Sequence, residues 1–487
     1  MKKKIGLVLG PLAFVIFLIF GRFEGLSNSG QSVLASTLWI AIWWVTEAIP
    51  IAATALLPII LFPLSEGMEL PTTTESYGHK YVFLYLGGFL IAIGIEKWNL
   101  HKRIAINIIS FIGTDVRKVI LGFMIATSFL SMWISNTATS VMMLPIGVAI
   151  IKQLKDNPAS LENENTIFGK ALMLAIAYSA SIGGIATLIG TPPNLVMAGV
   201  ISEIYNYEIT FFKWFIFGFP ISIILLFFCW YYITRVAYVF HQREFPGGSS
   251  EINRLKNDLG PISYEEKIIA IIFALAGFCW ITRSFFLQSI LPVIDDTIIA
   301  ISFGLILFVI PSKAKTNTLL NWKDTIQLPW GVIILFGGGM AIAKAFEISG
   351  LAIWLGELLT TLNTLPFFIL LIFLIAAVNF LTEITSNLAT TAMILPVLGS
   401  LAFEIGVHPF GIMIGAAVAA SCAFMLPVAT PPNAIVFGSG YLKIPDMVSR
   451  GIVLNIFSII LIAVMVYFIL PLLWNINLNN FPDQFNL

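Results

Sequence analysis

A short polar motif occurs twice in this chain, and both copies lie in apolar sequence. Residues 135–139 read Ser-Asn-Thr-Ala-Thr and residues 386–390 read Ser-Asn-Leu-Ala-Thr, at an offset of 251 residues. A Leu-Pro pair follows each copy, at Leu144 and at Leu395. Polar, turn-favouring residues at matching places in two apolar halves are typical of a membrane protein built from an internal repeat. The chain is therefore expected to fold as two related halves.

A second motif supports the same alignment. Residues 190–194 read Gly-Thr-Pro-Pro-Asn, and residues 429–433 read Ala-Thr-Pro-Pro-Asn. Two further matches keep the offset of 251 residues: Gly87-Gly88 with Gly338-Gly339, and Glu96 with Glu347. From the first motif to the second, the spacing is 56 residues in the first half and 44 in the second. The surplus maps onto the polar segment 152–165, which is expected to be a loop inserted in the first half only.

Composition places both halves in a membrane. Apolar residues make up 58% of the chain and charged residues 11%, with a mean hydropathy of +0.94. A soluble globule of this size carries more charge. About 20 apolar residues are needed to cross the hydrocarbon core, and about ten or more spans are expected, including 5–20, 34–61, 168–200, 211–233, 268–290 and 452–473. The formal net charge of zero gives no sign of nucleic acid binding.

The spans and a charged seam define the expected organisation. We assign residues 1–32 to a first transmembrane helix, 33–234 to the first repeat, 235–267 to a solvent-exposed linker and 268–487 to the second repeat. Lys2, Lys3 and Lys4 precede the first apolar run, and no small-residue cleavage pattern follows, so a retained helix is preferred to a signal peptide. The positive-inside rule then places the N-terminus in the cytoplasm. With no organelle-targeting segment visible, the expected location is a multi-pass protein of the plasma membrane.

The motifs have a physical consequence at membrane depth. Thr191-Pro192-Pro193-Asn194 and its second copy force a helix break, because each proline removes a backbone donor. Such a break is tolerated only inside protein or beside a water-filled cavity. The Ser-Asn-Thr segment favours a turn, so we expect a hairpin with arms 119–132 and 138–151. Single Ser and Thr residues often serve packing alone, but here both motifs are duplicated in the same order. Helix N-termini at the breaks would face an anion, and freed carbonyls would suit sodium.

At these residues the chain resembles a known family, the divalent anion/sodium symporters, which include sodium-coupled di- and tricarboxylate transporters. Residues 421–436, Ser-Cys-Ala-Phe-Met-Leu-Pro-Val-Ala-Thr-Pro-Pro-Asn-Ala-Ile-Val, are similar to the signature of that family. The resemblance implies an all-α polytopic fold of two inverted repeats with re-entrant hairpins and broken helices. It also implies a scaffold, a homodimer formed through scaffold helices, and a transport domain that moves as an elevator.

The resemblance also implies which residues bind substrate and sodium. Asn136, Thr137 and Asn387 would hold substrate carboxylates, with Leu388, Thr430 and Pro431 bordering the same pocket. One sodium site would comprise Ser131, Ser135, Asn136 and the carbonyl of Gly190. The second would comprise Thr382, Thr385, Asn387 and the carbonyl of Ala429. The sequence departs from the family at Leu388, where the first half has Thr137. Loss of that donor removes a hydrogen bond of about 1 to 3 kcal/mol to an ionised acceptor, and it bears on which anion is carried.

Charge favours cation coupling. Segments 119–151 and 171–201 contain no charged residue, and in 382–437 only Glu383, Glu404 and His408 are candidates for charge. No Lys or Arg in the motifs neutralises a bound dianion, and even one charged group is costly at the bilayer centre. Co-transported sodium is the simplest compensation. For Glu383 we favour a pairing with helix N-termini or a backbone donor, away from the pocket.

Several functions remain open at this point. The favoured one is sodium symport of C4-type dicarboxylates such as succinate, malate and fumarate, with oxoglutarate, citrate and sulfate also open. The alternative within transport is a sodium-independent dicarboxylate or tricarboxylate exchanger. An enzyme is disfavoured, because the four histidines and three cysteines are scattered and no nucleophile elbow or phosphate loop is present. No organic cofactor is expected, and the expected partners are a small dicarboxylate, membrane lipid and a second copy of the chain.

Overall fold

The computed structural model describes residues 2–21, 23–113, 115–155, 162–240, 248–314, 318–358 and 365–485. Within these residues the fold is helical, and an isolated β-bridge joins Pro311 and Thr318. The first part of the chain forms α1 (Lys2–Phe20), α2 (Asn28–Thr46), α3 (Ile51–Thr54), α4 (Leu57–Leu64), α5 (Leu70–Glu75), η1 (Ser76–Gly78), α6 (Lys80–Lys97), α7 (Leu100–Ile112), α8 (Val116–Ser131), α9 (Asn136–Lys155), α10 (Glu162–Ile185), α11 (Pro192–Tyr205), α12 (Phe211–Tyr231) and η2 (Tyr232–Ala237).

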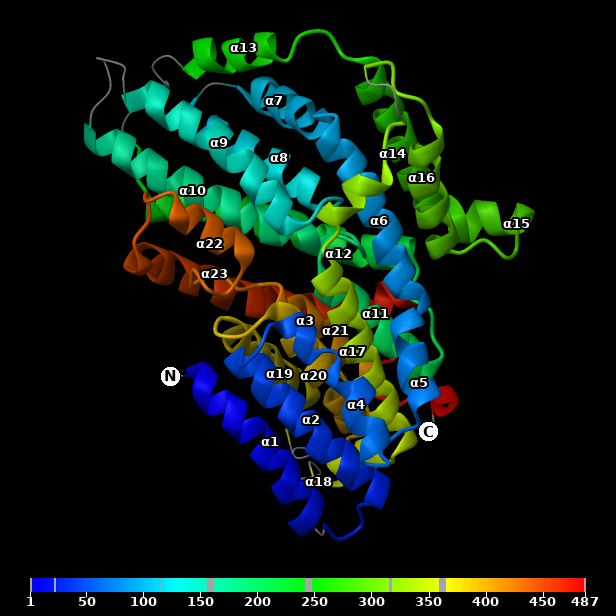
Figure 1. Cartoon of the computed structure of the whole chain (residues 1–487). Helices are drawn as coiled ribbons and strands as arrows, with labels where there is room; N and C mark the ends of the chain where they lie inside the picture. Colours follow the sequence, from blue (N-terminus) through cyan, green and yellow to red (C-terminus); the bar gives the residue numbers. More distant parts are fainter. Residues whose placement is uncertain are drawn as a thin grey trace.

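The second part begins with the amphipathic helix α13. Its elements are α13 (Gly248–Asp258), α14 (Tyr264–Thr282), η3 (Arg283–Leu287), α15 (Gln288–Ile290), α16 (Asp296–Val309), η4 (Trp322–Gln327), α17 (Trp330–Ile348), α18 (Leu351–Leu358), α19 (Phe367–Thr382), α20 (Asn387–Glu404), α21 (Pro409–Ala420), α22 (Pro431–Gly438), α23 (Ile444–Val464), η6 (Met465–Ile469), α24 (Leu470–Trp474) and η7 (Asp483–Phe485). Figure 1 shows α7 to α10 as neighbouring long helices beneath α13, with α14 to α16 extending to one side.

Eight helical stretches among the described residues are long and apolar enough to cross a membrane, and four shorter apolar helices accompany them. The chain is thus a multi-pass membrane protein. On α1, large apolar side chains are exposed, including Val8 at 66% and Phe20 at 75%, which is the surface that lipid covers. One expected span was wrong: residues 34–61 are not one helix. The backbone turns left-handed at Glu47 (φ 49°) and Pro50 precedes α3, so the run divides among α2, α3 and α4.

Three expected domain boundaries fall inside helices. Residue 32 lies in α2, which begins at Asn28 because Ser27 caps it by accepting a hydrogen bond from the Gly30 amide. Residue 234 lies in η2, and residue 267 lies in α14. Parts of the linker and of the inserted loop, 241–247 and 156–161, are outside the described residues. The described linker is helical at α13, which packs against α7 and α9.

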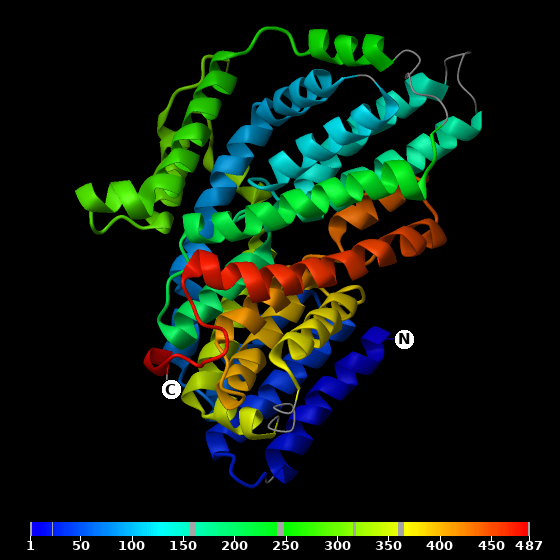
Figure 2. The same cartoon turned by 180° about the vertical axis from the view of Figure 1, so that it is seen from behind.

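Both halves place a helical hairpin against a broken helix. In the first half, the hairpin arms α8 and α9 pack against each other and against α10. In the second half, α19 and α20 pack against each other and against α21. Seen from behind, the long helices α12 and α23 run side by side (Figure 2), and they are in contact. Each half therefore brings its two motifs together through helix packing.

Candidate substrate and sodium site

Four helices begin at the four motif positions. The hairpin helices α9 and α20 start at Asn136 and Asn387, and the broken-helix segments α11 and α22 start at Pro192 and Pro431. The halves interlock, because α22 packs against α9 while α11 packs against α20. Both helices break near the proline motifs, but the non-helical segments are 186–191 and 421–430, not the expected 190–194 and 429–433. The two prolines and the asparagine of each motif form the first turn of the next helix, because a helix start needs no proline donor. Helix N-termini present unpaired amide groups and positive dipole ends, so this arrangement suits an anion.

Oxygen atoms converge at the first hairpin tip. Ser131 Oγ lies 2.6 Å from the Asn136 Oδ1 atom and 2.7 Å from the Ala180 carbonyl oxygen. The same carboxamide atom of Asn136 lies 3.2 Å from the Ala180 oxygen and 3.3 Å from the Gly190 oxygen. A methyl group at Gly184 would come within 2.6 Å of Asn136 Oδ1, so a glycine is needed at this approach. The structure therefore brings together Ser131, Asn136 and Gly190, as expected, and adds the Ala180 carbonyl.

The Asn136 carboxamide has two ways to satisfy this cluster. With its oxygen facing inward, Asn136 Oδ1 lies 2.6 to 3.3 Å from three other oxygen atoms, and grouped oxygens are the ligand type that a hard cation prefers. With the amide rotated by 180°, Nδ2 donates hydrogen bonds to Ser131, Ala180 and Gly190. The cluster is thus compatible with a sodium ion in one orientation and with direct hydrogen bonding in the other.

The second hairpin tip repeats the pattern. Thr382 Oγ1 lies 2.7 Å from Asn387 Oδ1 and 3.1 Å from the carbonyl oxygen of Ala420. Thr382 and Asn387 correspond to Ser131 and Asn136 at the offset of 251 residues. Ala429 ends the break, where it is buried and its amide donates to the Leu426 carbonyl at 3.2 Å.

Two expected sodium residues differ in their surroundings. The Thr385 hydroxyl is turned away from Asn387, since it lies 2.8 Å from the Leu381 carbonyl and 2.6 Å from Thr390 Oγ1. Ser135 accepts a hydrogen bond from the Ala138 amide at 3.2 Å and so caps α9. The residue that matches Ser135 by the constant offset is Ser386, next to Thr385, and it is the N-cap of α20. The offset alone could have identified Ser386, instead of Thr385, as the counterpart of Ser135 in the second sodium site.

The expected substrate residues are not equally accessible. Thr137 and Pro431 are exposed, and Asn136 and Asn387 are half-buried. Thr430 is buried, and its hydroxyl accepts a hydrogen bond from the Asn433 amide at 3.3 Å as the cap of α22. Leu388, which matches Thr137 in sequence, is only 6% exposed. The two halves therefore do not offer equivalent side chains at this position.

Glu383 is held by the second break. Its carboxylate accepts hydrogen bonds from the amides of Phe424, Met425 and Leu426 at 2.8, 2.9 and 3.0 Å. The side-chain amide of Asn455 adds a fourth at 2.7 Å. The side chain is buried, with 3% of the residue exposed. The expectation that Glu383 pairs with backbone donors is confirmed.

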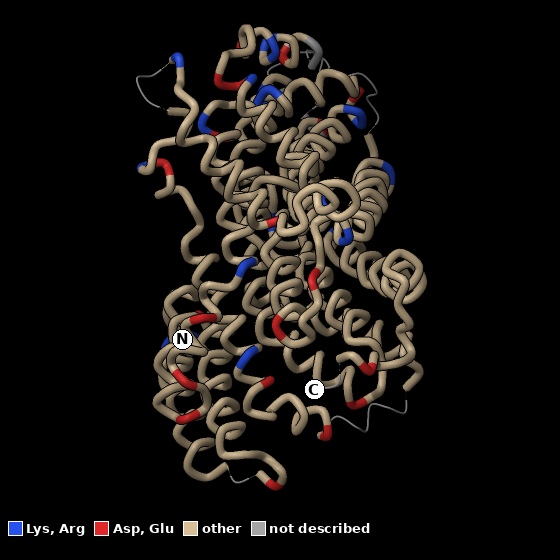
Figure 3. Tube along the Cα trace, turned by 90° about the vertical axis from the view of Figure 1, so that its right-hand side faces the viewer, with Lys and Arg blue, Asp and Glu red and all other residues tan. Residues whose placement is uncertain are grey.

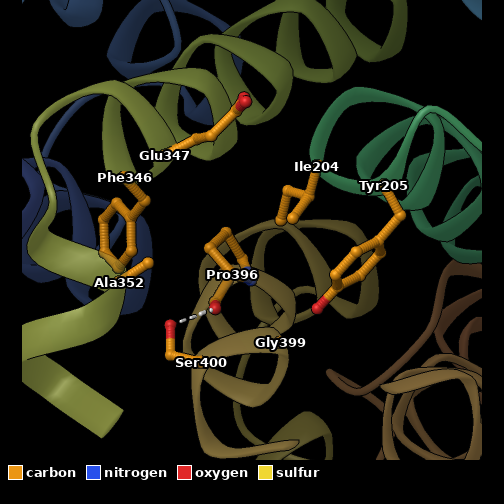
Figure 4. Close-up of a pocket in the computed structure, with 8 residues that line it drawn as sticks. All are labelled: Ile204, Tyr205, Phe346, Glu347, Ala352, Pro396, Gly399 and Ser400. Atoms are coloured by element: carbon orange, nitrogen blue, oxygen red, sulfur yellow. Dashed lines mark hydrogen bonds between the residues drawn. The ribbon is translucent and has the colours of Figure 1, made fainter. Parts of the chain in front are cut away.

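A small cavity lies away from the motifs. It is about 10 Å³ in volume and is bounded by α11, α17, α18 and α20 (Figure 4), with the lining residues Ile204, Tyr205, Phe346, Glu347, Ala352, Pro396, Gly399 and Ser400. This volume holds about one water molecule. Pro396 is about 14 Å along α20 from Asn387. The cavity therefore belongs to helix packing at Pro396 and not to the motif site.

Comparison with known proteins agrees with the motifs. Residues 2–476 match the family described as "Sodium:sulfate symporter transmembrane region". The sodium-dependent dicarboxylate transporter SdcS of Staphylococcus aureus strain USA300 is 48% identical over 481 residues, which cover 98% of this chain and 92% of that protein. SdcS of strain MRSA252 gives the same identity and coverage.

Two solved structures share the fold at low sequence identity. The Neisseria gonorrhoeae protein MtrF, described as illuminating a class of antimetabolite efflux pumps, has a TM-score of 0.57 at 12% identity and covers 95% of this chain and 93% of its own. The Alcanivorax borkumensis transporter YdaH has a TM-score of 0.56 at 12% identity, with 81% and 86% covered. At this identity the likeness concerns the fold alone. The family match and the SdcS relatives cover nearly the whole chain, and this protein therefore belongs to the sodium:sulfate symporter family, the divalent anion/sodium symporters.

Proposed function

We propose that this protein is a sodium-coupled symporter of C4-type dicarboxylates such as succinate, malate and fumarate. The observation that carries the proposal is the duplicated oxygen cluster at Asn136 and Asn387, beside four helix N-termini. The SdcS relatives are named as sodium-dependent dicarboxylate transporters, which supports a dicarboxylate as the substrate and sodium as the coupled ion. The protein is proposed to move its substrate without chemical change, and not to act as an enzyme.

Charge explains why sodium is needed. Helix N-termini attract a dianion but carry only partial charges. Among the described residues, the ion pairs lie outside both motifs, for example Lys170 with Asp446 at 2.8 Å and Arg103 with Glu266 at 2.9 Å. The buried carboxyl group of Glu383 lies close to the second break and supplies no positive charge. Sodium ions at the two clusters offset the charge of the anion, which is otherwise prohibitive at membrane depth.

The orientation of the Asn136 carboxamide links the two ligands. When the oxygen faces the cluster and a sodium ion, Nδ2 points the other way and is free to donate to a carboxylate. When the amide is rotated, Nδ2 is used by Ser131, Ala180 and Gly190, and the oxygen facing away repels a carboxylate. Sodium selects the first orientation, so sodium binding raises the affinity for the dicarboxylate, and by linkage the dicarboxylate raises the affinity for sodium.

The family suggests a proposal for the remaining architecture. We propose a homodimer of two inverted repeats, in which the hairpins and broken helices move together as an elevator in the plasma membrane. Lys and Arg gather at the end of the molecule that carries α7 and α13, whereas Asp and Glu predominate at the opposite end (Figure 3). By the positive-inside rule, Lys2, Lys3 and Lys4 ahead of the first span place the N-terminus in the cytoplasm.

Uptake into proteoliposomes tests this proposal. Labelled succinate is offered with sodium or potassium outside, to vesicles that are empty or preloaded with unlabelled dicarboxylate. Sodium-dependent uptake into empty vesicles is the expected result. Uptake only into preloaded vesicles, with no response to sodium, would establish an exchanger and overturn the proposal.

A further inference from the structure

The asparagines that end the two proline motifs have the same buried position. Asn194 and Asn433 lie in the first turns of α11 and α22, and both are fully buried. Neither is among the residues expected to touch sodium or substrate. A buried side-chain amide needs hydrogen-bond partners, and the partners of these two identify what they do.

Both side chains bond to carbonyls across the helix break, and the sequence separations are the same in the two halves. Asn194 Nδ2 donates to the carbonyls of Thr187 at 2.8 Å and Gly184 at 3.2 Å, which are seven and ten residues earlier. Asn433 Nδ2 donates to the carbonyls of Leu426 at 3.0 Å and Ala423 at 3.2 Å, again seven and ten residues earlier. The breaks free these carbonyls from helical partners, and at membrane depth they must be satisfied within the protein.

The same carbonyls also close a turn that leads to the proposed sodium ligands. The Thr187 carbonyl accepts from the Gly190 amide at 3.3 Å as well as from Asn194. The Leu426 carbonyl accepts from the Ala429 amide at 3.2 Å as well as from Asn433. With both lone pairs engaged, the turn has little freedom to rotate. The carbonyls of Gly190 and Ala429 at its end are then fixed in direction.

We propose that Asn194 and Asn433 are positioning residues for sodium, each holding one break so that the carbonyl of Gly190 or of Ala429 points at its cluster. This inference rests on the proposed sodium coupling. The two residues do not contribute equally. In the second half, three backbone amides of the break also bind Glu383, including the Leu426 amide. The first break has no such carboxylate. At the matching place the Thr187 hydroxyl donates one hydrogen bond to the Met132 carbonyl, in place of the three backbone hydrogen bonds to Glu383, so the first break depends more on its asparagine.

The test is a sodium titration of succinate uptake for Asn194→Leu and Asn433→Leu, which keep the branched shape and the number of side-chain heavy atoms and remove the donor. Removing a group that orients a metal ligand typically costs about 10- to 100-fold in ion affinity. We expect a rise in sodium half-saturation of that order for Asn194→Leu and a smaller rise for Asn433→Leu. The KM for succinate at saturating sodium should stay at its wild-type value. A general loss of structure would instead change both parameters.

Ser222→Ala is the matched control. Ser222 of α12 is fully buried and donates to the carbonyl of Ile182 at 2.9 Å, which lies in α10 about one turn before the break. Its sodium half-saturation should equal that of the wild type. Where a leucine variant does not fold, Asn194→Ser keeps a donor that is too short to reach both carbonyls and should give an intermediate shift.

Two results overturn the inference in distinguishable ways. A sodium-dependent wild type with unchanged sodium half-saturation in both asparagine variants would show that these residues do not orient sodium ligands. A wild type that transports without responding to sodium would remove the proposed coupling itself, and the inference with it.

Discussion

The two helix breaks share one plan but are held by different groups. In the first half, the Thr187 side chain donates to the backbone carbonyl of Met132. In the second half, the matching positions are Leu426 and Glu383, and here the Leu426 backbone amide donates to the Glu383 side chain. The hydrogen bond has exchanged its side-chain and backbone partners. The geometry of the break is thus common to both halves, while the residues that fix it are not, and only the second break carries a buried carboxylate.

The largest effect on succinate uptake is expected at the asparagine that both halves have at the hairpin tip. Asn136→Ala and Asn387→Ala each remove the carboxamide that joins an oxygen cluster to a helix N-terminus. Either change should reduce succinate uptake to the level of protein-free vesicles, because sodium and carboxylate lose the same ligand. Thr391→Val, which removes a hydroxyl bonded only to the Asn387 carbonyl at 2.8 Å, serves as the control. Transport by one alanine variant but not the other would show that the two clusters are not equivalent in function.

The next effect concerns the carboxylate that only the second half has. Glu383→Gln places an amide group against backbone donors that need an acceptor, and breaking such a buried set costs about 3 kcal/mol or more. The melting temperature in detergent should therefore fall clearly. At the matching position of the first half, Met132→Leu conserves volume and should cost less than about 1.5 kcal/mol. Equal melting temperatures for the two variants would contradict the structural role given to Glu383.

A smaller effect separates the neighbours Thr385 and Ser386. Ser386 matches Ser135, whereas the Thr385 hydroxyl is occupied by Leu381 and Thr390. Ser386→Ala should raise the sodium half-saturation of uptake. Thr385→Val should lower stability by about 1 kcal/mol through its lost hydrogen bond and leave the sodium response in place. The opposite assignment of the two phenotypes would return Thr385 to the sodium site.

The smallest effect is expected from restoring sequence symmetry at Leu388. A threonine there adds a hydroxyl like that of Thr137, but Leu388 is buried and Thr137 is exposed. Leu388→Thr should therefore change succinate KM little, while Thr137→Ala should raise it by about tenfold, the effect of losing about 1.4 kcal/mol. A large gain of affinity in Leu388→Thr would mean that position 388 faces the bound anion.

The sequence predicted the parts of this site that have a side-chain signature. The constant offset located both hairpin tips and both breaks, because prolines and small polar residues disfavour helix interiors. The cluster of Ser131 with Asn136, and of Thr382 with Asn387, followed from the resemblance. The sequence analysis also expected Glu383 to pair with backbone donors, although it did not say which residues supply them.

Other parts had no side-chain signal. The carbonyls of Ala180 and Ala420 belong to apolar residues inside α10 and α21, and only the packing of those helices brings their oxygens to the hairpins. Segment 34–61 reads as one apolar span, because its left-handed turn at Glu47 depends on local backbone geometry. The opposite exposure of Thr137 and Leu388 arises from the different neighbours of the two hairpins, which a sequence alignment between the halves does not contain.

In the proposed transport cycle, each of the two clusters carries a sodium ion together with the anion. The most direct measurement is the initial uptake of radioactive sodium and labelled succinate, in parallel, into the same empty proteoliposomes. With one ion at each cluster, at least two sodium ions should enter for each succinate. Succinate uptake without accompanying sodium would contradict it.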